Sequence, residues 1–179
     1  MALLALAAGS PAYHYQLDSA NSQVSAKVSY MGFGSKIARF PAMHGAIRLV
    51  PDHLEVIDLD VVLDASAMTA GSKSDTAYLR GKDFFDVAHH PTISFSGHRM
   101  TMTSATTAQI DGQITARGVT RPAALAVTFR DPPARTTGRD PIQLSATTAI
   151  NRKDFGMTSY GLIIGKKVTI TIEARLVPG

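Results

Sequence analysis

Apolar and polar residues alternate with a period of two along most of this chain. The alternation defines eight segments, at residues 24–30, 43–49, 57–63, 93–95, 108–116, 123–129, 142–150 and 168–176. Successive side chains of a β-strand point to opposite faces of a sheet, so each segment predicts a strand that is apolar on one side only. Residues 13–17 show the same pattern and form a candidate ninth strand.

Only one stretch, between residues 63 and 91, predicts a helix. Ser72 and Asp75 fit an N-terminal capping box, and Gly81 is suited to ending the helix that follows. A single short helix among so many strands excludes a parallel sheet built from strand–helix–strand units. The polar outer faces also exclude an outer-membrane barrel, which carries an apolar belt on its outside. The pattern therefore predicts an all-β fold, either an antiparallel barrel or a two-sheet sandwich.

Basic residues gather at one end of the fold if the strands run up and down. Four connections, at residues 31–42, 64–90, 117–122 and 151–167, then share one end and contain eleven lysines and arginines against five aspartates. This local excess of positive charge is larger than the net charge of +4 of the whole 179-residue chain. We therefore expect an electropositive mouth lined with aromatic residues.

Several inward positions of the predicted strands hold small residues, namely Ala26, Gly45, Ala108, Gly112, Ala116, Ala123 and Ala146. The interior of an eight-stranded barrel can be filled by side chains or can hold one small ligand. The small residues favour a lumen with space for a ligand. Large neighbours such as Phe95, Leu125 and Phe129 favour the alternative, a filled core.

The chain has no cysteine, which excludes disulfides, thiolate nucleophiles and cysteine-ligated metals. His89 and His90 are adjacent, and adjacent side chains of an extended chain point apart, so we expect no metal site. No Gly-x-Ser-x-Gly elbow indicates a serine hydrolase, and residues 156–161 lack the Lys-Ser/Thr of a phosphate-binding loop. We expect no nucleic-acid partner, because the aromatic residues alternate inward instead of lining a basic stripe.

The first twelve residues form a short apolar run that ends in Ser10-Pro11-Ala12. A small-x-small ending after such a run is typical of the cleavage site of a secretory signal peptide. We expect residues 1–12 to be the remnant of an export leader and residues 13–179 to form the folded domain. No other segment approaches the roughly 18 apolar residues of a transmembrane helix.

Residues 79–95 read Leu-Arg-Gly-Lys-Asp-Phe-Phe-Asp-Val-Ala-His-His-Pro-Thr-Ile-Ser-Phe and change from a helical to an alternating pattern at the proline. This segment resembles the signature of the YceI-like family. Three further segments resemble that family in the same order. They are the hairpin at residues 110–122, Ile-Asn-Arg-Lys-Asp-Phe-Gly-Met at 150–157, and Gly-Lys-Lys-Val-Thr-Ile at 165–170.

The resemblance implies an antiparallel eight-stranded lipocalin-like barrel with one short helix between strands, exported to the periplasm. It also implies an isoprenoid lipid as ligand, either a polyprenyl phosphate or an isoprenoid quinone, without enzymatic activity and without a cofactor or metal. An alternative is a redox or stress-response module with a cofactor in the same cavity. Transient contact with a membrane surface and a homodimer are further expectations. Family members often have histidine where this chain has Tyr30 and Tyr78, which leaves the head group open.

On this basis the expected ligand contacts lie in the lumen and at its mouth. They are Val28, Tyr30, Phe33, Leu59, Val61, Leu63, Tyr78, Leu79, Phe84, Phe85, Phe95, Ile110, Ile114, Leu125, Val127, Ala146, Ile150 and Phe155. The expected head-group contacts are the basic residues Arg117, Arg121, Arg152 and Lys153.

Overall fold

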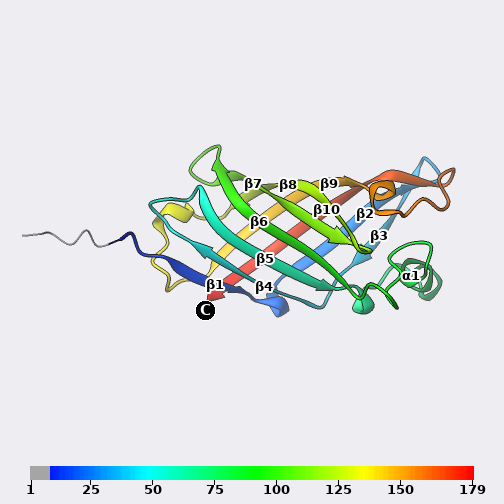
Figure 1. Cartoon of the computed structure of the whole chain (residues 1–179), viewed down its shortest axis with the longest axis horizontal. Helices are drawn as coiled ribbons and strands as arrows, with labels where there is room; N and C mark the ends of the chain where they lie inside the picture. The colour runs from blue at the N-terminus through cyan, green and yellow to red at the C-terminus, as the bar shows by residue number, and fades with distance from the viewer. Residues whose placement is uncertain (1–8) are drawn as a thin grey trace, which may run out of the picture.

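Ten strands and one α-helix make up residues 9–179, the part of the chain that the computed structural model describes (Figure 1). The strands are β1 (Tyr13–Leu17), β2 (Gln23–Tyr30), β3 (Gly34–Arg39), β4 (Met43–Leu49), β5 (Val56–Asp64), β6 (Thr92–Met102), β7 (Thr107–Ala116), β8 (Val119–Phe129), β9 (Ile142–Asn151) and β10 (Ile164–Pro178). The helix is α1 (Lys73–Arg80), and short 3₁₀ helices lie at Ser19–Asn21, Ala65–Ala67, Pro133–Arg135 and Arg152–Phe155. Most of the expected leader, residues 1–12, lies outside the described residues, so the leader stays a prediction.

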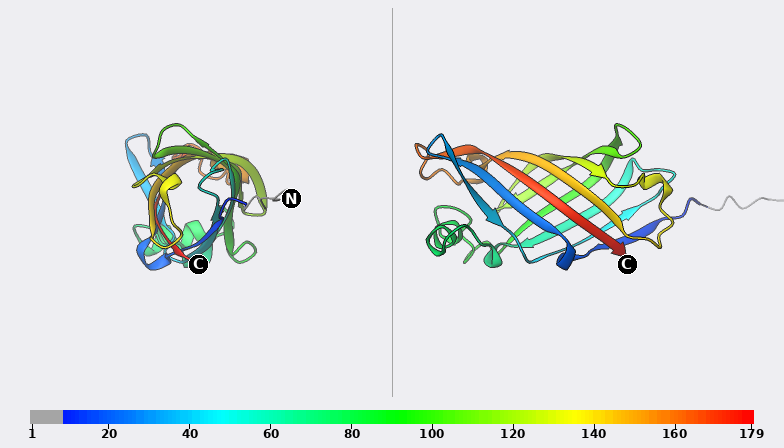
Figure 2. Two further views of the ribbon diagram at one scale, coloured as in Figure 1. Left: turned by 90° about the vertical axis from the view of Figure 1, so that its left-hand side faces the viewer. Right: turned by 180° about the vertical axis from the view of Figure 1, so that it is seen from behind.

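The strands form one antiparallel sheet that closes into a barrel. Eight strands follow the order β1-β4-β5-β6-β7-β8-β9-β10, and the ring closes where residues 15–17 of β1 pair with residues 176–178 of β10. β2 and β3 extend the wall from the other part of β10, between Ile164 and Glu173. Figure 2 shows the closed ring end-on. The all-β, eight-stranded antiparallel barrel with one short helix is therefore confirmed.

Strand β3 lies where the sequence pattern predicts part of a connection. Lys36 and Ala38 are its more buried positions, and Ile37 is exposed, so β3 lacks the alternation that identifies the other strands. Pairing with β2 along its whole length and one bridge from Arg39 to Thr69 hold it in place. The expected connection at residues 31–42 is therefore wrong, because this stretch contains a strand.

Helix α1 begins at the predicted capping residue. The Ser72 hydroxyl oxygen accepts a hydrogen bond from the Asp75 amide at 3.0 Å, and Gly81 caps the C-terminus. The helix lies at the same end of the barrel as the β2–β3, β7–β8 and β9–β10 connections (Figures 1 and 2). The expected grouping of these connections at one mouth is thus confirmed.

The end of the barrel opposite α1 is filled by side chains. Its core consists of Tyr15, Ile47, Leu49, Leu54, Ile57, Met100, Ala108, Ile110, Leu125, Val127, Phe129, Ile142, Ala146 and Leu176. Phe95 packs against this core and also against a second apolar cluster nearer the mouth. A Cβ atom on Gly112 would lie 2.6 Å from the Phe95 ring. The expectation that Ala108, Gly112 and Ala146 leave space is wrong, because large neighbours occupy that volume.

Candidate functional site

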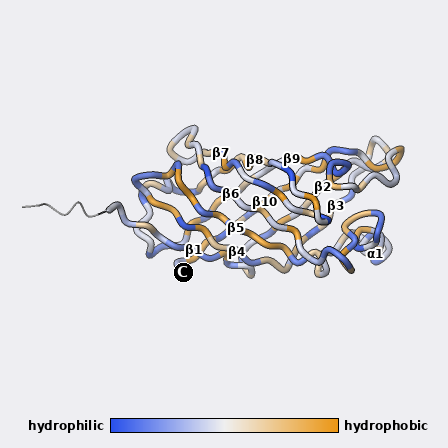
Figure 3. Tube along the Cα trace, in the orientation of Figure 1, coloured by the Kyte–Doolittle hydropathy of each residue, from blue (hydrophilic) through white to orange (hydrophobic). Residues whose placement is uncertain are grey.

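A cavity of about 900 Å³ occupies the α1 end of the barrel. Its apolar wall residues are Val24, Ala26, Val28, Ile37, Ala38, Phe40, Leu63, Ala70, Leu79, Phe84, Phe85, Ile93, Ile114, Ala116, Ile150, Met157, Ile163, Ile164, Val168 and Ile170. Period-two alternation places most of these side chains on the inner face of the sheet. Figure 3 shows apolar positions recurring along the strands and at the loops of this end. The cavity therefore offers an apolar volume that suits an apolar chain.

Phe84 and Phe85 both reach the cavity wall, although neighbouring residues of a regular strand could not. The chain turns tightly before them, because the Phe84 amide donates a hydrogen bond to the Gly81 carbonyl at 3.1 Å. The Phe84 ring stacks on Tyr160 with ring centroids 5.9 Å apart, and the Phe85 ring meets Phe40 edge-on at 6.0 Å. The two rings thus join the segment after α1 to two other sides of the cavity.

Arg152 lines the cavity and is almost completely buried, with 2% of its surface exposed. Its guanidinium donates four hydrogen bonds to backbone carbonyls. The acceptors are Met157 (2.5 Å), Ser159 (2.9 Å), Ile164 (2.9 Å) and Gly165 (2.9 Å). These bonds hold the β9–β10 loop in its conformation, so Arg152 has a structural role in addition to its charge.

The charge of Arg152 has no acidic partner within residues 9–179, where no carboxylate lies within 4.0 Å of it. Burial lowers the pKa of Arg152 below its ordinary value, yet a guanidinium remains protonated at neutral pH. The carbonyl dipoles solvate the charge but do not neutralise it. Because buried charges in proteins are usually paired, the cavity wall is electrostatically suited to an anionic group.

Lys36 brings a second positive charge to the cavity wall. Its Nζ atom lies 2.9 Å from Asp75 Oδ2 and 4.7 Å from the centroid of the Tyr30 ring, and both partners also line the cavity. The hydrogen bond to Asp75 raises the pKa of Lys36, which keeps the ammonium group charged at neutral pH. Since Lys36 belongs to β3 and Asp75 to α1, the ion pair connects the edge of the sheet to the helix.

Arg117 lies outside the cavity and ties together the loops around it. Positive φ angles of 51° at Arg117 and 71° at Gly118 form the two-residue turn between β7 and β8. The guanidinium donates one hydrogen bond to the Lys82 carbonyl at 2.7 Å and another to the Gly156 carbonyl. Arg117 therefore links three segments of the mouth, and both of its terminal nitrogens already have acceptors.

Half of the expected ligand contacts lie on the cavity wall: Val28, Tyr30, Leu63, Tyr78, Leu79, Phe84, Phe85, Ile114 and Ile150. The other half do not: Phe33, Leu59, Val61, Phe95, Ile110, Leu125, Val127, Ala146 and Phe155. Phe33 is 90% exposed on the β2–β3 turn, and most of the others belong to the filled end. Phe155 packs in the second cluster, beside the stretch where β8 and β9 no longer pair.

Only Arg152 of the four expected head-group contacts lines the cavity. Arg121 and Lys153 are both exposed. Arg121 has the same parity in β8 as the inward residue Leu125, but it lies at the end of the strand, beyond the cavity wall. Lys36 is a wall residue that the sequence reasoning did not select. No sequence signal marks it, since β3 itself is not recognisable from alternation. Val168 and Ile170 were also missed, although the alternation of residues 168–176 could have identified them.

Within residues 9–179, no three histidine, cysteine, aspartate or glutamate side chains come together as a metal ion would need. His89 instead forms a hydrogen bond with Asp86 at 3.0 Å. The helix search over the same residues finds none with the length and apolar character needed to cross a bilayer.

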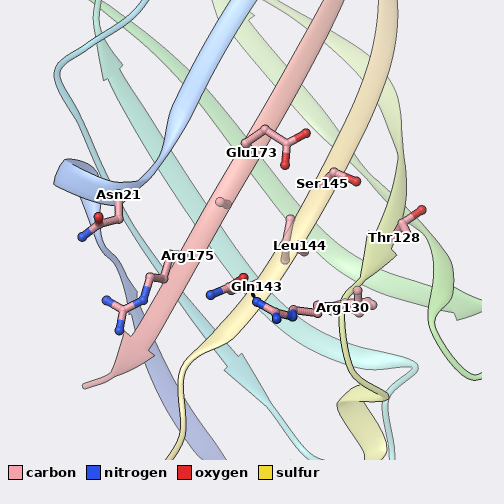
Figure 4. A pocket seen from close by; sticks show the side chains of 10 residues that line it. Asn21, Thr128, Arg130, Gln143, Leu144, Ser145, Glu173 and Arg175 are labelled. Carbon is pink, nitrogen blue, oxygen red and sulfur yellow. Dashed lines mark hydrogen bonds between the residues drawn. The ribbon is translucent and has the colours of Figure 1, made fainter.

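A second depression, of about 570 Å³, lies near the opposite end of the wall (Figure 4). The side chains that Figure 4 draws around it come mainly from β8, β9 and β10 and are mostly polar, including Glu173 and Arg175. Arg130 donates a hydrogen bond to Gln143 at 2.8 Å across part of it. This depression lacks the apolar wall of the large cavity.

Comparison with known proteins gives a family match over nearly the whole described chain. The model of the YceI-like domain matches residues 15–176. A UPF0312 protein from Pseudomonas savastanoi pv. phaseolicola is 26% identical over 143 residues, which cover 77% of this chain and 72% of that protein. A UPF0312 protein from Pseudomonas putida is 26% identical over 152 residues, which cover 84% and 79% of the two chains.

Solved structures share the fold at low sequence identity. BcnA from Burkholderia cenocepacia superposes with a TM-score of 0.78 at 18% identity, covering 89% of this chain and 98% of that chain. A polyisoprenoid binding domain from Saccharophagus degradans, implicated in plant cell wall breakdown, gives a TM-score of 0.69 at 12% identity, with coverages of 92% and 98%. The YCEI protein of Campylobacter jejuni gives 0.68 at 21% identity, with coverages of 77% and 82%.

Proposed function

The chain belongs to the YceI-like family, and on that premise we propose that it binds and carries an amphipathic isoprenoid lipid without catalysing a reaction. The observation that carries the proposal is the apolar cavity of about 900 Å³ with the cationic side chains Lys36, Arg39 and Arg152 in its wall. The shared fold with a domain described as polyisoprenoid binding supports the same ligand class.

The apolar tail of the ligand occupies the cavity between β2, β3 and the segment that contains Phe84 and Phe85. Each CH₂ group transferred from water into such a site contributes about 0.8 kcal/mol. A few isoprene units therefore offset the cost of ordering the chain and the loss of translational freedom, which lies between about 4 and 15 kcal/mol. The filled end, which begins at Phe95, limits how far the tail extends into the barrel.

The polar head of the ligand lies near Arg152 and Lys36. The buried guanidinium of Arg152 has no acidic partner in the described chain, and Lys36 is more accessible than Arg152. An anionic head group compensates the unpaired charge of Arg152, and Lys36 adds attraction although Asp75 already pairs with it. Opposite charges in such a partly desolvated site attract more strongly than in bulk water. A polyprenyl phosphate therefore fits this site better than a neutral isoprenoid quinone.

A protein that carries such a lipid must be in a compartment where it can take the lipid from a membrane. We place the mature protein in the periplasm on the basis of the leader-like residues 1–12, and the protein mass after export from its native host tests this. A start near Tyr13 supports export, and an intact Met1 on protein in that compartment contradicts it.

A homodimer stays a prediction that sedimentation velocity tests.

The proposal is tested by titrating the protein with farnesyl phosphate and with farnesol, which share one apolar tail and differ in charge. Lys36→Met should weaken binding of farnesyl phosphate by roughly tenfold to a hundredfold, because hydrogen bonds to charged groups contribute about 1.5–3 kcal/mol. Binding of farnesol should change little. The matched control is Lys27→Met, which removes an exposed lysine on the outer face of β2.

Equal losses for both ligands in Lys36→Met would show that the lysine does not contact the head group. Failure of the wild type to bind either ligand would contradict the proposal itself. The redox or stress-response alternative requires a cofactor in the same cavity. A visible absorption band in the purified protein, retained through dialysis, would favour that alternative over a colourless lipid.

A further inference from the structure

The large apolar side chains that are exposed cluster at one end of the barrel. Within residues 9–179 they are Met31, Phe33, Ile37, Val56, Tyr78, Tyr160, Leu162 and Ile163. All except Val56 belong to the β2–β3 hairpin, to α1 or to the β9–β10 loop, at the end where the cavity lies. Soluble proteins rarely expose contiguous apolar surface without an interaction partner, so this distribution requires an explanation.

Three of these side chains form the outermost part of the cluster, which we call the apolar rim. They are Met31, Phe33 and Leu162, of which Met31 is 50% exposed, Phe33 is 90% exposed and Leu162 is fully exposed. None of the three lines the cavity. Figures 1 and 2 show the β2–β3 turn and the β9–β10 loop side by side at the tip of the barrel, and Figure 3 shows apolar colour there.

The two segments that carry the apolar rim are bonded to each other. The Met31 amide donates a hydrogen bond to the Ile163 carbonyl at 2.7 Å, and Tyr30 pairs with Ile164 at the start of β10. Positive φ angles at Met31 and at Gly32 define the turn that holds Phe33 outward. The exposure of the rim is thus a property of a hydrogen-bonded structure that continues the barrel wall.

Three exposed lysines accompany the apolar rim, namely Lys153, Lys166 and Lys167. Within residues 9–179, no carboxylate lies within 4.0 Å of any of them. Lys166 and Lys167 follow Leu162 by four and five residues, at the start of β10. An apolar tip next to unpaired lysines matches a bilayer surface, where acyl chains lie beneath anionic phosphates.

We infer that the apolar rim and its three lysines form a docking surface for an anionic membrane. Phe33, Met31 and Leu162 enter the interfacial layer, and the lysines contact lipid phosphates. Tyr160 and Ile163 are adjacent to the rim and line the cavity, so docking brings the cavity mouth to the bilayer. The inference rests on the proposed function, because the membrane is then the source or the destination of the bound lipid.

The docking surface is tested by measuring vesicle binding with an introduced tryptophan as fluorescent reporter. The protein contains no tryptophan, so Phe33→Trp introduces a unique fluorophore on the rim. Val56→Trp is the matched control, because Val56 is 53% exposed at the opposite end of the barrel. Vesicles of phosphatidylcholine mixed with phosphatidylglycerol should shift the emission of the Phe33→Trp protein to the blue and leave that of Val56→Trp unchanged.

Charge and apolar contributions are separated by flotation of further variants with the same vesicles. Lys166→Ala with Lys167→Ala should weaken binding by roughly tenfold to thirtyfold, from about 1 kcal/mol for each basic residue near an anionic surface. Arg135→Ala with Arg139→Ala removes the same charge from the exposed loop at the other end and should have no effect. Phe33→Ser with Leu162→Ser should abolish binding to these vesicles.

These experiments can contradict the docking inference and the proposed lipid-binding function independently. Protein that carries lipid but floats with no vesicle overturns the docking inference and leaves the proposed function intact. Vesicle binding by Phe33→Ser with Leu162→Ser at wild-type strength also overturns it. A wild-type dimer that becomes a monomer in these variants, without vesicle binding, would show that a second copy of this chain covers the rim. A lipid-free protein that still docks would contradict the proposed function alone.

Discussion

Replacing Ala26 with phenylalanine should fill part of the cavity without unfolding the barrel. Ala26 lies on the cavity wall in β2, and its neighbours across the sheet, Ala38 and Ile170, also line the cavity. A phenyl ring takes up about the space of one isoprene unit. Displacing five carbon atoms of the tail at about 0.8 kcal/mol each costs about 4 kcal/mol, which is a loss of roughly a thousandfold in affinity.

The same substitution should not lower the stability of the lipid-free protein, because the ring enters existing space beside apolar neighbours. Ala146→Phe is the contrasting variant. Ala146 is 3% exposed within the filled end, where overpacking should lower the free energy of unfolding by about 1–3 kcal/mol. Titration with farnesyl phosphate and urea denaturation measure both quantities. A folded Ala26→Phe protein that binds farnesyl phosphate as tightly as the wild type would refute the placement of the tail.

Two further substitutions test structural roles. One is that of Arg152 in the β9–β10 loop, and the other is that of Asp18, whose carboxylate accepts hydrogen bonds from Asn21 and Arg175. Arg152→Met should lower the free energy of unfolding by about 3 kcal/mol, since hydrogen bonds from a charged group contribute about 1.5–3 kcal/mol and the buried carbonyls lose their donor; an unchanged midpoint in urea would contradict this role. The hydrogen bonds from Asn21 and Arg175 lower the pKa of Asp18, so the unfolded state binds its proton more tightly. The stabilisation by Asp18 is therefore full above the ordinary aspartate pKa of about 4 and is lost as the pH falls below it. Asp18→Asn should reduce the acid sensitivity of the urea midpoint, whereas Asp52→Asn, at an exposed turn, should not; equal curves for both variants would contradict the assignment.

The alternation of apolar and polar residues was sufficient to predict most strands of the sheet, because one face of most strands is apolar. It failed at β3, where Lys36 and Ala38 are the inward positions and no apolar alternation exists. The same holds for the residues of the cavity wall: some could be predicted from alternation and others could not. Val28 and Ile114 could be predicted from alternation, whereas Lys36 depends on a strand that the pattern does not reveal.

The boundary between filled core and cavity could not be derived from residue size alone. Gly112 and Ala146 are small, yet Phe95 and other large side chains occupy the space next to them. The orientation of the basic side chains could not be predicted from the sequence either. Arg117 and Arg152 both lie in mouth segments, but hydrogen bonds turn Arg117 toward the loops and place Arg152 against the cavity. Such choices depend on the tertiary partners of each residue, which local sequence does not specify.

Mass spectrometry of the organic extract of the protein, purified from its native host, tests the central claim most directly. The account predicts a long-chain isoprenoid lipid in the extract of the wild type, with an anionic head group, and a strongly reduced amount in the extract of Ala26→Phe. A wild-type protein whose extract contains no isoprenoid, and which takes up none when farnesyl phosphate is added, would contradict the account.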